Sequence, residues 1–250
     1  MKTDLHVHTN YSPDAKADST FERNCQCAID NSIDIICFTD HIDVYGPFET
    51  YRNFDFVNRK KDYAKVCKRY EGKMQILFGL EYAEPNTNLE LFEKVTKATE
   101  YDFILGSVHI PTELYLRGQL NVEQLWQEQY SRTLAMAKVG KFDSLAHLDF
   151  PKKFVNKYCY DQTMTEQILK ECVKNNISLE INTSTMRKNL PPSPQMEVIE
   201  LYHKLGGKYV TIGSDSHNVT DIGSNYDDIC STLPKGIVIC YYKKRKLIEL

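Results

Sequence analysis

The chain has 250 residues, a formal net charge of -3 and a pI near 6.2, with 42% hydrophobic and 26% charged residues. This is the composition of a folded globular protein, and the slight acidic excess argues against a nucleic-acid or membrane-surface binder, which would need basic charge. No apolar run approaches the roughly 18 residues of a transmembrane helix, and no signal-peptide pattern opens the chain, so we expect a cytoplasmic protein.

Short β-rich segments alternate with longer helical segments along the whole chain. We predict strands at residues 4–8, 33–39, 74–81, 102–109, 143–148, 177–183, 209–215 and 236–242. Several are nearly continuous apolar runs, as in parallel strands that are buried on both faces. This alternation indicates parallel βαβ units, and no linker or composition shift divides the chain. We therefore predict a single α/β domain over residues 1–250.

The helices between these strands have recognisable ends. We expect N-caps at Ser19 and Thr163, each followed three residues later by glutamate, and at Ser193, which precedes a proline. Gly140 and Gly206 are placed where helix C-caps belong.

Two longer segments, residues 42–54 and 110–121, are predicted as loops. Long loops in such folds often cover the active site. We therefore expect both of them near the site.

The eight cysteines and the basic run "KKRK" at residues 243–246 are predicted to have structural roles and no part in the chemistry. The cysteines fall mostly in predicted helices and strands without a C-x-x-C pair, which indicates reduced packing residues and argues against a zinc ribbon. The basic run stands beside the C-terminus and is predicted to be a solvated tail.

Six of the seven histidines fall at the C-terminal ends of predicted strands: His6, His8, His41, His109, His147 and His217. Asp14, Glu81 and Asp215 share those ends, whereas His203 lies in a helical segment and is expected on its surface. Active sites of barrel-like α/β folds are built at this rim. Each residue alone could be structural, but together the nine exceed the three or four ligands of one zinc ion. They suit two or three divalent ions, and mixed imidazole and carboxylate ligation admits zinc, manganese or iron.

The motifs "HVH", "TDH", "GLE", "SVH", "AHLD" and "SDSH" occur in this order along the chain. Their pattern resembles the PHP (polymerase and histidinol phosphatase) superfamily from residue 4 to about residue 233. The segments "LEINTSTMRKNLPPSP" and "LGGKYVTIGSDSHNVTDIGSNYDD" resemble more narrowly its histidinol-phosphate phosphatase branch. The segment "LDFPKKF" and Thr185 depart from the family pattern, in loops that would contact substrate.

The resemblance implies a distorted (β/α)7 barrel, similar to a TIM barrel, with a trinuclear metal cluster. Carried over to this chain, the family pattern assigns the first ion to His6, His8, Glu81 and Asp215. It assigns the second to His109, His147 and the bridging Glu81, and the third to Asp14, His41 and His217.

The implied activity is hydrolysis of the phosphomonoester L-histidinol phosphate in histidine biosynthesis. We expect a hydroxide between the first two ions to attack phosphorus, with Glu81 as the bridging catalytic residue. The leaving group would take its proton from Asp14, His217 or a metal-bound water. Arg187 and Arg117 are the candidates for binding the phosphate, because arginine makes bidentate contacts with phosphate oxygens.

Other polar residues near the predicted strand ends receive supporting roles. Glu113 or Asp43 would accept the substrate's ammonium group. Asp40, Asp149 and Ser216 neighbour predicted ligands in the sequence and are expected to orient imidazoles.

Three alternatives stay open at this point. The chain could be a phosphatase of the same fold that acts on a sugar phosphate or a nucleotide, a nuclease of the same superfamily, or a metal-binding module without activity. The acidic charge and the lack of a basic channel with interleaved aromatic residues argue against the nuclease. The complete ligand set argues against the inactive module. We expect a small-molecule partner, no nucleic acid and no membrane, and predict no oligomeric state.

Overall fold

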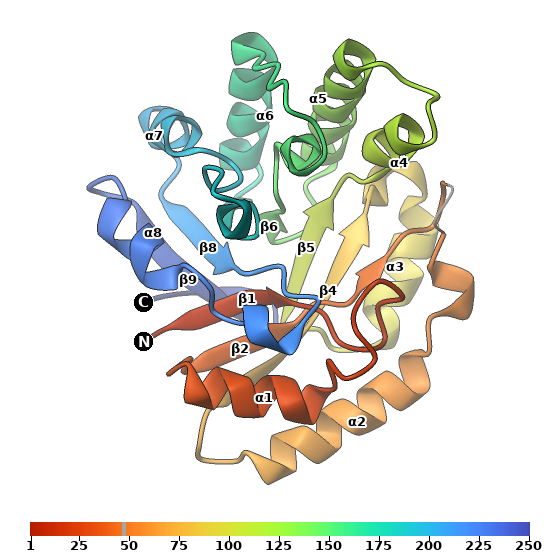
Figure 1. The fold of residues 1–250 in the computed structure, drawn as a ribbon, viewed down its shortest axis with the longest axis vertical. Coiled ribbons are helices and arrows are strands. Elements are labelled where there is room, and N and C mark those ends of the chain that lie inside the picture. Colours follow the sequence, from red (N-terminus) through yellow and green to blue (C-terminus); the bar gives the residue numbers. More distant parts are fainter. Residues whose placement is uncertain (47–48) are drawn as a thin grey trace.

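A computed structural model of the chain describes residues 1–46 and 49–250, and shows strands surrounded by helices (Figure 1). The strands are β1 (Thr3–Val7), β2 (Ile35–Phe38), β3 (His41–Ile42), β4 (Gln75–Ala83), β5 (Phe103–Ser107), β6 (Ser144–Leu145), β7 (Ser178–Asn182), β8 (Tyr209–Gly213), β9 (Val238–Lys243) and β10 (Lys246–Glu249). The α-helices are α1 (Phe21–Asp30), α2 (Phe56–Arg69), α3 (Leu89–Ala98), α4 (Ile110–Leu116), α5 (Val122–Val139), α6 (Gln162–Lys174), α7 (Met196–Lys204) and α8 (Tyr226–Thr232). The predicted α/β class and the eight predicted strands are confirmed, whereas β3 and β10 were not predicted.

The strands form a distorted barrel. The sheet runs in the order β1-β2-β4-β5-β6-β7-β8-β9-β10, and β3 pairs with β4. A parallel bridge between Val7 and Ser216 joins the end of β1 to the segment after β8, which closes the ring. At the amino end of β8, Tyr209 and Val210 pair with β9 and not with β1, so the barrel is open at that end. The predicted seven-stranded (β/α) barrel therefore carries β9 and β10 as an added hairpin.

Three predicted N-caps are wrong. Thr20 caps α1 in place of Ser19, and Asp161 caps α6 in place of Thr163, each accepting a hydrogen bond from the backbone N–H three residues further on. In both helices a neighbouring cap residue was better placed. Ser193 exchanges backbone hydrogen bonds with β7, and α7 starts three residues after it.

The predicted C-caps and the two long loops had different outcomes. Gly140 is the left-handed C-cap of α5, and Gly206 follows the cap of α7 with positive φ, as predicted. The predicted loop 110–121 is wrong over its first half, because α4 begins there with a proline in its first turn. Residues 42–54 contain a short 3-10 helix, and residues 47 and 48 of this segment lie outside the described residues.

The basic run 243–246 is the turn of the β9–β10 hairpin, so its prediction as a solvated tail is wrong. Lys243 Nζ lies 3.1 Å from Asp102 Oδ2, and Arg245 Nε lies 2.8 Å from Asp143 Oδ1. The two aspartates also accept hydrogen bonds from backbone N–H groups of β4 and β5. The hairpin is thereby fastened to the amino ends of the barrel strands.

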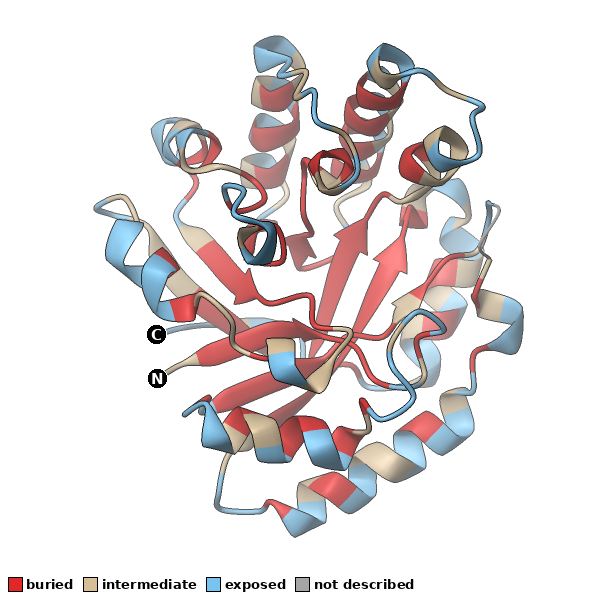
Figure 2. Ribbon diagram, viewed as in Figure 1, coloured by how far each residue is buried: buried red, intermediate tan, exposed pale blue. Residues whose placement is uncertain are grey.

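Burial follows the barrel, with buried strands inside and exposed outer faces on the helices (Figure 2). Successive side chains of a strand alternate between its two faces, so Leu77 and Glu81 of β4 share one face. Leu77 belongs to a small apolar cluster with Phe103, Leu105 and residues of β9. This cluster is the floor below Glu81. Within the described residues, no helix combines the length and apolarity needed to cross a membrane.

Candidate metal centre

The nine predicted ligand residues converge at the carboxyl ends of the barrel strands. Seven of the nine, together with Asp43, form overlapping groups of three whose possible ligand atoms lie within 4.8 Å of one another: His6, His8 and Glu81; His8, His41 and His217; Glu81, His109 and His147; and His41, Asp43 and His109. His203 lies apart, exposed on α7, as predicted. The structure thus brings the predicted residues together, and their role as ligands stays a prediction.

Glu81 lies at the centre of this cluster with its side chain almost fully buried. Its Oε2 atom lies 3.1 Å from His6 Nε2 and 3.5 Å from His8 Nε2. Its Oε1 atom lies 3.1 Å from His109 Nε2 and 2.9 Å from His147 Nε2. Each oxygen therefore faces a different pair of imidazoles, which is the arrangement that a bridging carboxylate needs.

Asp215 completes the first pair, because its Oδ1 lies 3.7 Å from His6 Nε2 and 3.4 Å from His8 Nε2. Its backbone has φ 52°, a left-handed conformation that a non-glycine residue adopts at a cost of about 1 kcal/mol. Lys153 forms an ion pair with its other oxygen, Oδ2. Lys153 was not among the predicted site residues, although the departure of "LDFPKKF" from the family pattern marked its loop.

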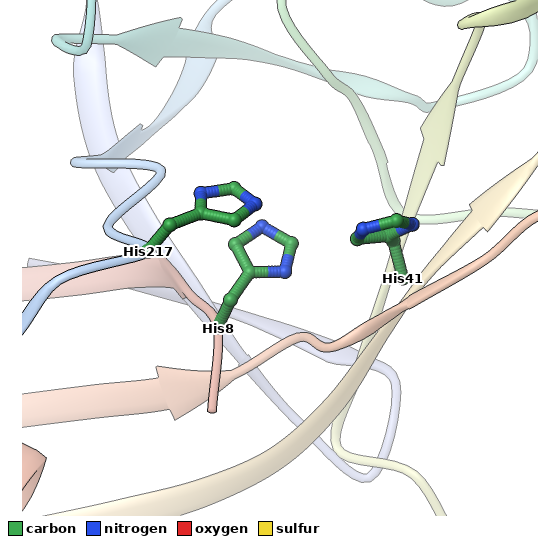
Figure 3. Close-up of side chains that lie close together, drawn as sticks. All are labelled: His8, His41 and His217. Atoms are coloured by element: carbon green, nitrogen blue, oxygen red, sulfur yellow. The ribbon is translucent and has the colours of Figure 1, made fainter. Parts of the chain in front are cut away.

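The third group lies at the open end of the cluster. The rings of His8 and His217 are stacked with their centroids 4.0 Å apart, and His41 lies across from them (Figure 3). The two oxygens of Asp14 lie 2.9 Å from His41 Nε2 and 3.1 Å from His217 Nε2. The side chain of Asp14 is 58% exposed, compared with 2% for Glu81, so this group is open to solvent.

The charges within the cluster are strongly coupled. Burial opposes charge on every imidazole, but the surrounding carboxylates raise the pKa values of His6, His41, His217 and His109, the last to about 10. Conversely, burial favours the neutral form of Glu81, but the nearby imidazoles, chiefly His6 and His109, hold its pKa well below the ordinary value.

Two imidazoles behave differently. Burial lowers the pKa of His8 to about 3 and also lowers that of His147, so both rings are neutral at physiological pH. The buried His8 Nε2 and His147 Nδ1 have no hydrogen-bond partner among the described residues. A buried polar atom without a partner is costly, and a bound cation would satisfy the His8 lone pair, which faces two carboxylates. The donor set of imidazole nitrogen and carboxylate oxygen also suits zinc, so the residues present fit a metal centre.

Glu180 supports the centre and was not predicted as a site residue. Its Oε1 accepts a hydrogen bond from His6 Nδ1 at 2.6 Å, and its Oε2 accepts one from the backbone N–H of His147 at 2.8 Å. Gly213 makes room for this contact, since a Cβ atom there would lie 2.4 Å from the Cβ of His6 and 2.6 Å from Glu180 Oε1. The signal in the sequence was an acidic residue inside the apolar strand "ISLEIN".

The three residues predicted to orient imidazoles do not contact those rings directly in the described part of the chain. Asp40 pairs with the buried Arg59 and accepts a hydrogen bond from Ser12 Oγ at 3.1 Å, and it is this hydroxyl that lies 3.0 Å from His8 Nδ1. Asp149 instead binds the side chains of Lys152 and Ser193, and the Ser216 hydroxyl donates to a backbone carbonyl two residues on.

A cleft of about 720 Å³ opens above the cluster, within the size range of small-molecule sites. Arg187 lines it, with Nη1 donating to the Ser214 carbonyl at 2.7 Å and Nε 3.4 Å from Asp221. Residues of both predicted covering segments also line it, including Asp43 and Glu113. Arg117, at the exposed end of α4, is not among the described lining residues, and its contact with substrate stays a prediction.

Comparison with known proteins gives consistent results. A family model described as the PHP domain matches residues 4–184. A probable histidinol-phosphatase of Thermotoga maritima is 29% identical over 235 residues, which cover 93% of this chain and 91% of that protein. A probable histidinol-phosphatase of Clostridium acetobutylicum is also 29% identical, over 242 residues that cover 90% of each chain.

A similar fold occurs in the crystal structure of the histidinol phosphate phosphatase of Lactococcus lactis, which is complexed with zinc, L-histidinol and phosphate. The two structures align with a TM-score of 0.82 and 21% identity, over 99% of this chain and 98% of that chain. This likeness supports the predicted distorted barrel.

Proposed function

This chain belongs to the PHP domain family, and from that premise we propose that it hydrolyses L-histidinol phosphate to L-histidinol and phosphate in a metal-dependent reaction. The observation that carries the proposal is the position of Glu81, whose two oxygens face two different imidazole pairs at the bottom of the cleft. A phosphomonoester is very stable in water, so its hydrolysis needs an activated nucleophile and neutralised phosphate charge. The cluster has the residues to hold ions that supply both.

Two to three divalent ions, which are zinc, manganese or iron, would be held by the three groups. The first comprises His6, His8, Glu81 and Asp215, the second Glu81, His109 and His147, and the third Asp14, His41 and His217. When bound, such ions lower the pKa of water and neutralise phosphate charge. The barrel supplies a rigid frame, because Glu81 and His41 are paired in register on neighbouring strands.

Cationic side chains on the cleft wall bind the substrate's phosphate. Arg187 and Lys153 both line the cleft, and Lys153 already neutralises the buried carboxylate of Asp215. The Ser214 carbonyl fixes the guanidinium of Arg187 and so orients its remaining N–H groups. Because this side chain is already ordered, little conformational entropy is lost when the phosphate binds.

The leaving alkoxide takes its proton at the open end of the cluster. Asp14 and His217 are the candidates, because they are the more exposed members of the nine and lie 3.1 Å apart. In the metal-free chain Asp14 and Asp215 raise the pKa of His217 against the effect of burial, and once His217 gives up its proton as a ligand, a water held at this end would be the donor.

The remaining part of the cleft suits an aromatic, positively charged substrate. Phe150 and the exposed side chains of Leu116 and Phe154 form an apolar wall for an imidazole ring. Of the two carboxylates predicted to accept the ammonium group, Asp43 has both oxygens within 2.8 Å of ring nitrogens of His41 and His109. Glu113 of α4, the other carboxylate predicted for this contact, lines the same cleft and is the acceptor that we propose. We place the reaction in the cytoplasm, which the eight free cysteines support.

The test is phosphate release by the zinc- or manganese-loaded protein from L-histidinol phosphate, sugar phosphates, mononucleotides and a single-stranded oligonucleotide. We expect kcat/KM for L-histidinol phosphate to exceed that of every other compound by about 100-fold or more, because the proposed contacts recognise its phosphate, its imidazole ring and its ammonium group together. Removal of the ions by a chelator should abolish the reaction, and their return should restore it. Equal rates across the panel would overturn the substrate assignment, and activity without ions would overturn the metal-dependent mechanism.

A further inference from the structure

The carboxylate of Asp43 lies between two imidazoles that belong to different ion groups of the proposed centre. Its Oδ2 accepts a hydrogen bond from His41 Nδ1 at 2.6 Å, and its Oδ1 accepts one from His109 Nδ1 at 2.8 Å. We infer that Asp43 is a positioning residue that fixes one ligand of the second ion and one ligand of the third ion at the same time. This inference rests on the proposed metal centre and adds a coupling between two of its ions.

The hydrogen bonds of Asp43 decide which ring nitrogens face the ions. An imidazole that binds a metal ion through nitrogen is neutral and carries one N–H, and an ionised carboxylate can only accept, so as ligands both rings must carry that hydrogen on Nδ1. The lone pair then lies on Nε2 of each ring. In the structure His41 Nε2 lies 2.9 Å from Asp14, and His109 Nε2 lies 3.1 Å from Glu81. Asp43 thus orients both rings in the tautomer that a metal ligand needs.

Asp43 is held in place by its own neighbours. Its backbone N–H donates to Thr50 Oγ1 at 2.8 Å, and its carbonyl accepts from the backbone N–H of Thr50 at 2.9 Å. The Thr50 hydroxyl donates in turn to the carbonyl of His41. The side chain of Asp43 is only 4% exposed, so water does not compete for its oxygens. The carboxylate is therefore a fixed part of the centre.

Two substitutions of Asp43 distinguish loss of support for both imidazole rings from loss of support for only one of them. Asp43→Ala leaves neither Nδ1–H with its acceptor. Asp43→Asn leaves one oxygen, and its NH2 group faces the other Nδ1, which favours the tautomer with hydrogen on Nε2. Because the amide can support either ring but not both, occupation of one ion site should lower the metal affinity of the other site.

The experiment measures zinc affinities of the metal-free full chain by competition with a chromogenic chelator. For Asp43→Ala we expect two of the three ions to bind about 10- to 100-fold more weakly, while the ion of His6, His8 and Asp215 keeps its affinity. For Asp43→Asn we expect the two affected ions to bind unequally, one close to wild type and the other weakened. His41→Ala and His109→Ala, which each remove a ligand from one ion, should each weaken a single ion.

Asp143→Asn is the matched control, because it makes the same change in a buried carboxylate at the opposite end of the barrel, and it should leave all zinc affinities unchanged. Thermal unfolding of the metal-free variants checks that they are folded. If Asp43→Ala does not fold, Thr50→Val tests the same point by removing the hydroxyl that holds Asp43, and it should weaken the same two ions to a smaller extent.

A folded Asp43→Ala, or Thr50→Val in its place, that weakens one ion or none would overturn the inference and leave the proposed function intact. A wild-type chain that binds none of zinc, manganese and iron would overturn both.

Discussion

Buried carboxylates lie at both ends of the barrel, but their partners differ. At the amino ends of the strands, Asp102 and Asp143 accept hydrogen bonds from backbone N–H groups and pair with Lys243 and Arg245 of the β9–β10 hairpin. At the carboxyl ends, Glu81 faces four imidazoles and no lysine or arginine among its described ion pairs.

This difference separates a structural pair from an ion site. Lysine and arginine keep their charge at physiological pH, so Asp102 and Asp143, at the amino ends of the strands (the lower end of the barrel), always face a positive charge. An imidazole can give up its proton, so the cluster at the carboxyl ends of the strands (the upper end of the barrel) can exchange protons for metal ions. A buried carboxylate that faces imidazoles, as Glu81 does, therefore indicates a metal centre, whereas one whose charged partners are only lysine or arginine does not.

The largest difference between the two ends should appear when a buried carboxylate is replaced by its amide. Glu81→Gln should lower kcat by at least about 10³-fold, because it removes the charge shared by two ion groups. The far-ultraviolet circular dichroism spectrum should not change, since the apolar floor below Glu81 stays intact. Near-normal turnover at full metal loading would contradict the bridging role of Glu81.

A smaller loss of activity is expected when a residue on the wall of the cleft is replaced. Arg187→Ala should raise KM and lower kcat/KM by roughly 10- to 100-fold, the value of one or two charge-assisted hydrogen bonds to phosphate. Zinc affinity should stay constant, because Arg187 contacts backbone carbonyls and Asp221 but belongs to no ion group. Arg52→Ala, in an exposed ion pair on the outer surface, is the control. An unchanged kcat/KM would remove Arg187 from the phosphate site.

The smallest effect on catalysis is expected at the lower end, where Asp143→Asn should leave kcat/KM unchanged and alter the pH dependence of stability. Burial, which outweighs the Arg245 charge, raises the pKa of Asp143 from 3.8 to about 6. The folded chain therefore binds this proton more tightly than the unfolded chain, and the stability it contributes is present below 3.8 and lost as pH rises through about 6.

Denaturant unfolding across this pH range measures the effect. The free energy of unfolding of the wild type, relative to that of Asp143→Asn, should fall with rising pH and become constant above about pH 7. A difference independent of pH would show that Asp143 is already charged throughout. A loss of activity in the variant would contradict the separation of the two ends.

The frame of the site was predictable from the sequence because it follows from strand positions. Apolar runs marked β4, β5 and β7, and residues that follow parallel strands must meet at one rim. Local details were harder to predict, because adjacent residues such as Ser19 and Thr20 both suit a helix cap and tertiary contacts choose between them.

The supporting contacts could not be predicted, because they join distant parts of the chain. Glu180 meets His6 across 174 residues, and Lys153 meets Asp215 across 62. No local pattern specifies such distances. The basic run of the β9–β10 hairpin was mistaken for a tail for the same reason, since Asp102 and Asp143 lie more than 100 residues before the residues that pair with them.

Titration of zinc into the metal-free wild-type protein tests the central claim most directly. The heat of binding is measured by calorimetry in buffers of different ionisation enthalpy, at about pH 6 and about pH 8. Because the carboxylates raise the pKa values of His6 and His41 well above the ordinary value and that of His109 to about 10, these three rings are protonated before zinc binds. We expect zinc binding to release protons and its affinity to rise with pH. Binding without proton release, or no binding at all, would contradict the account of the upper end as a metal centre.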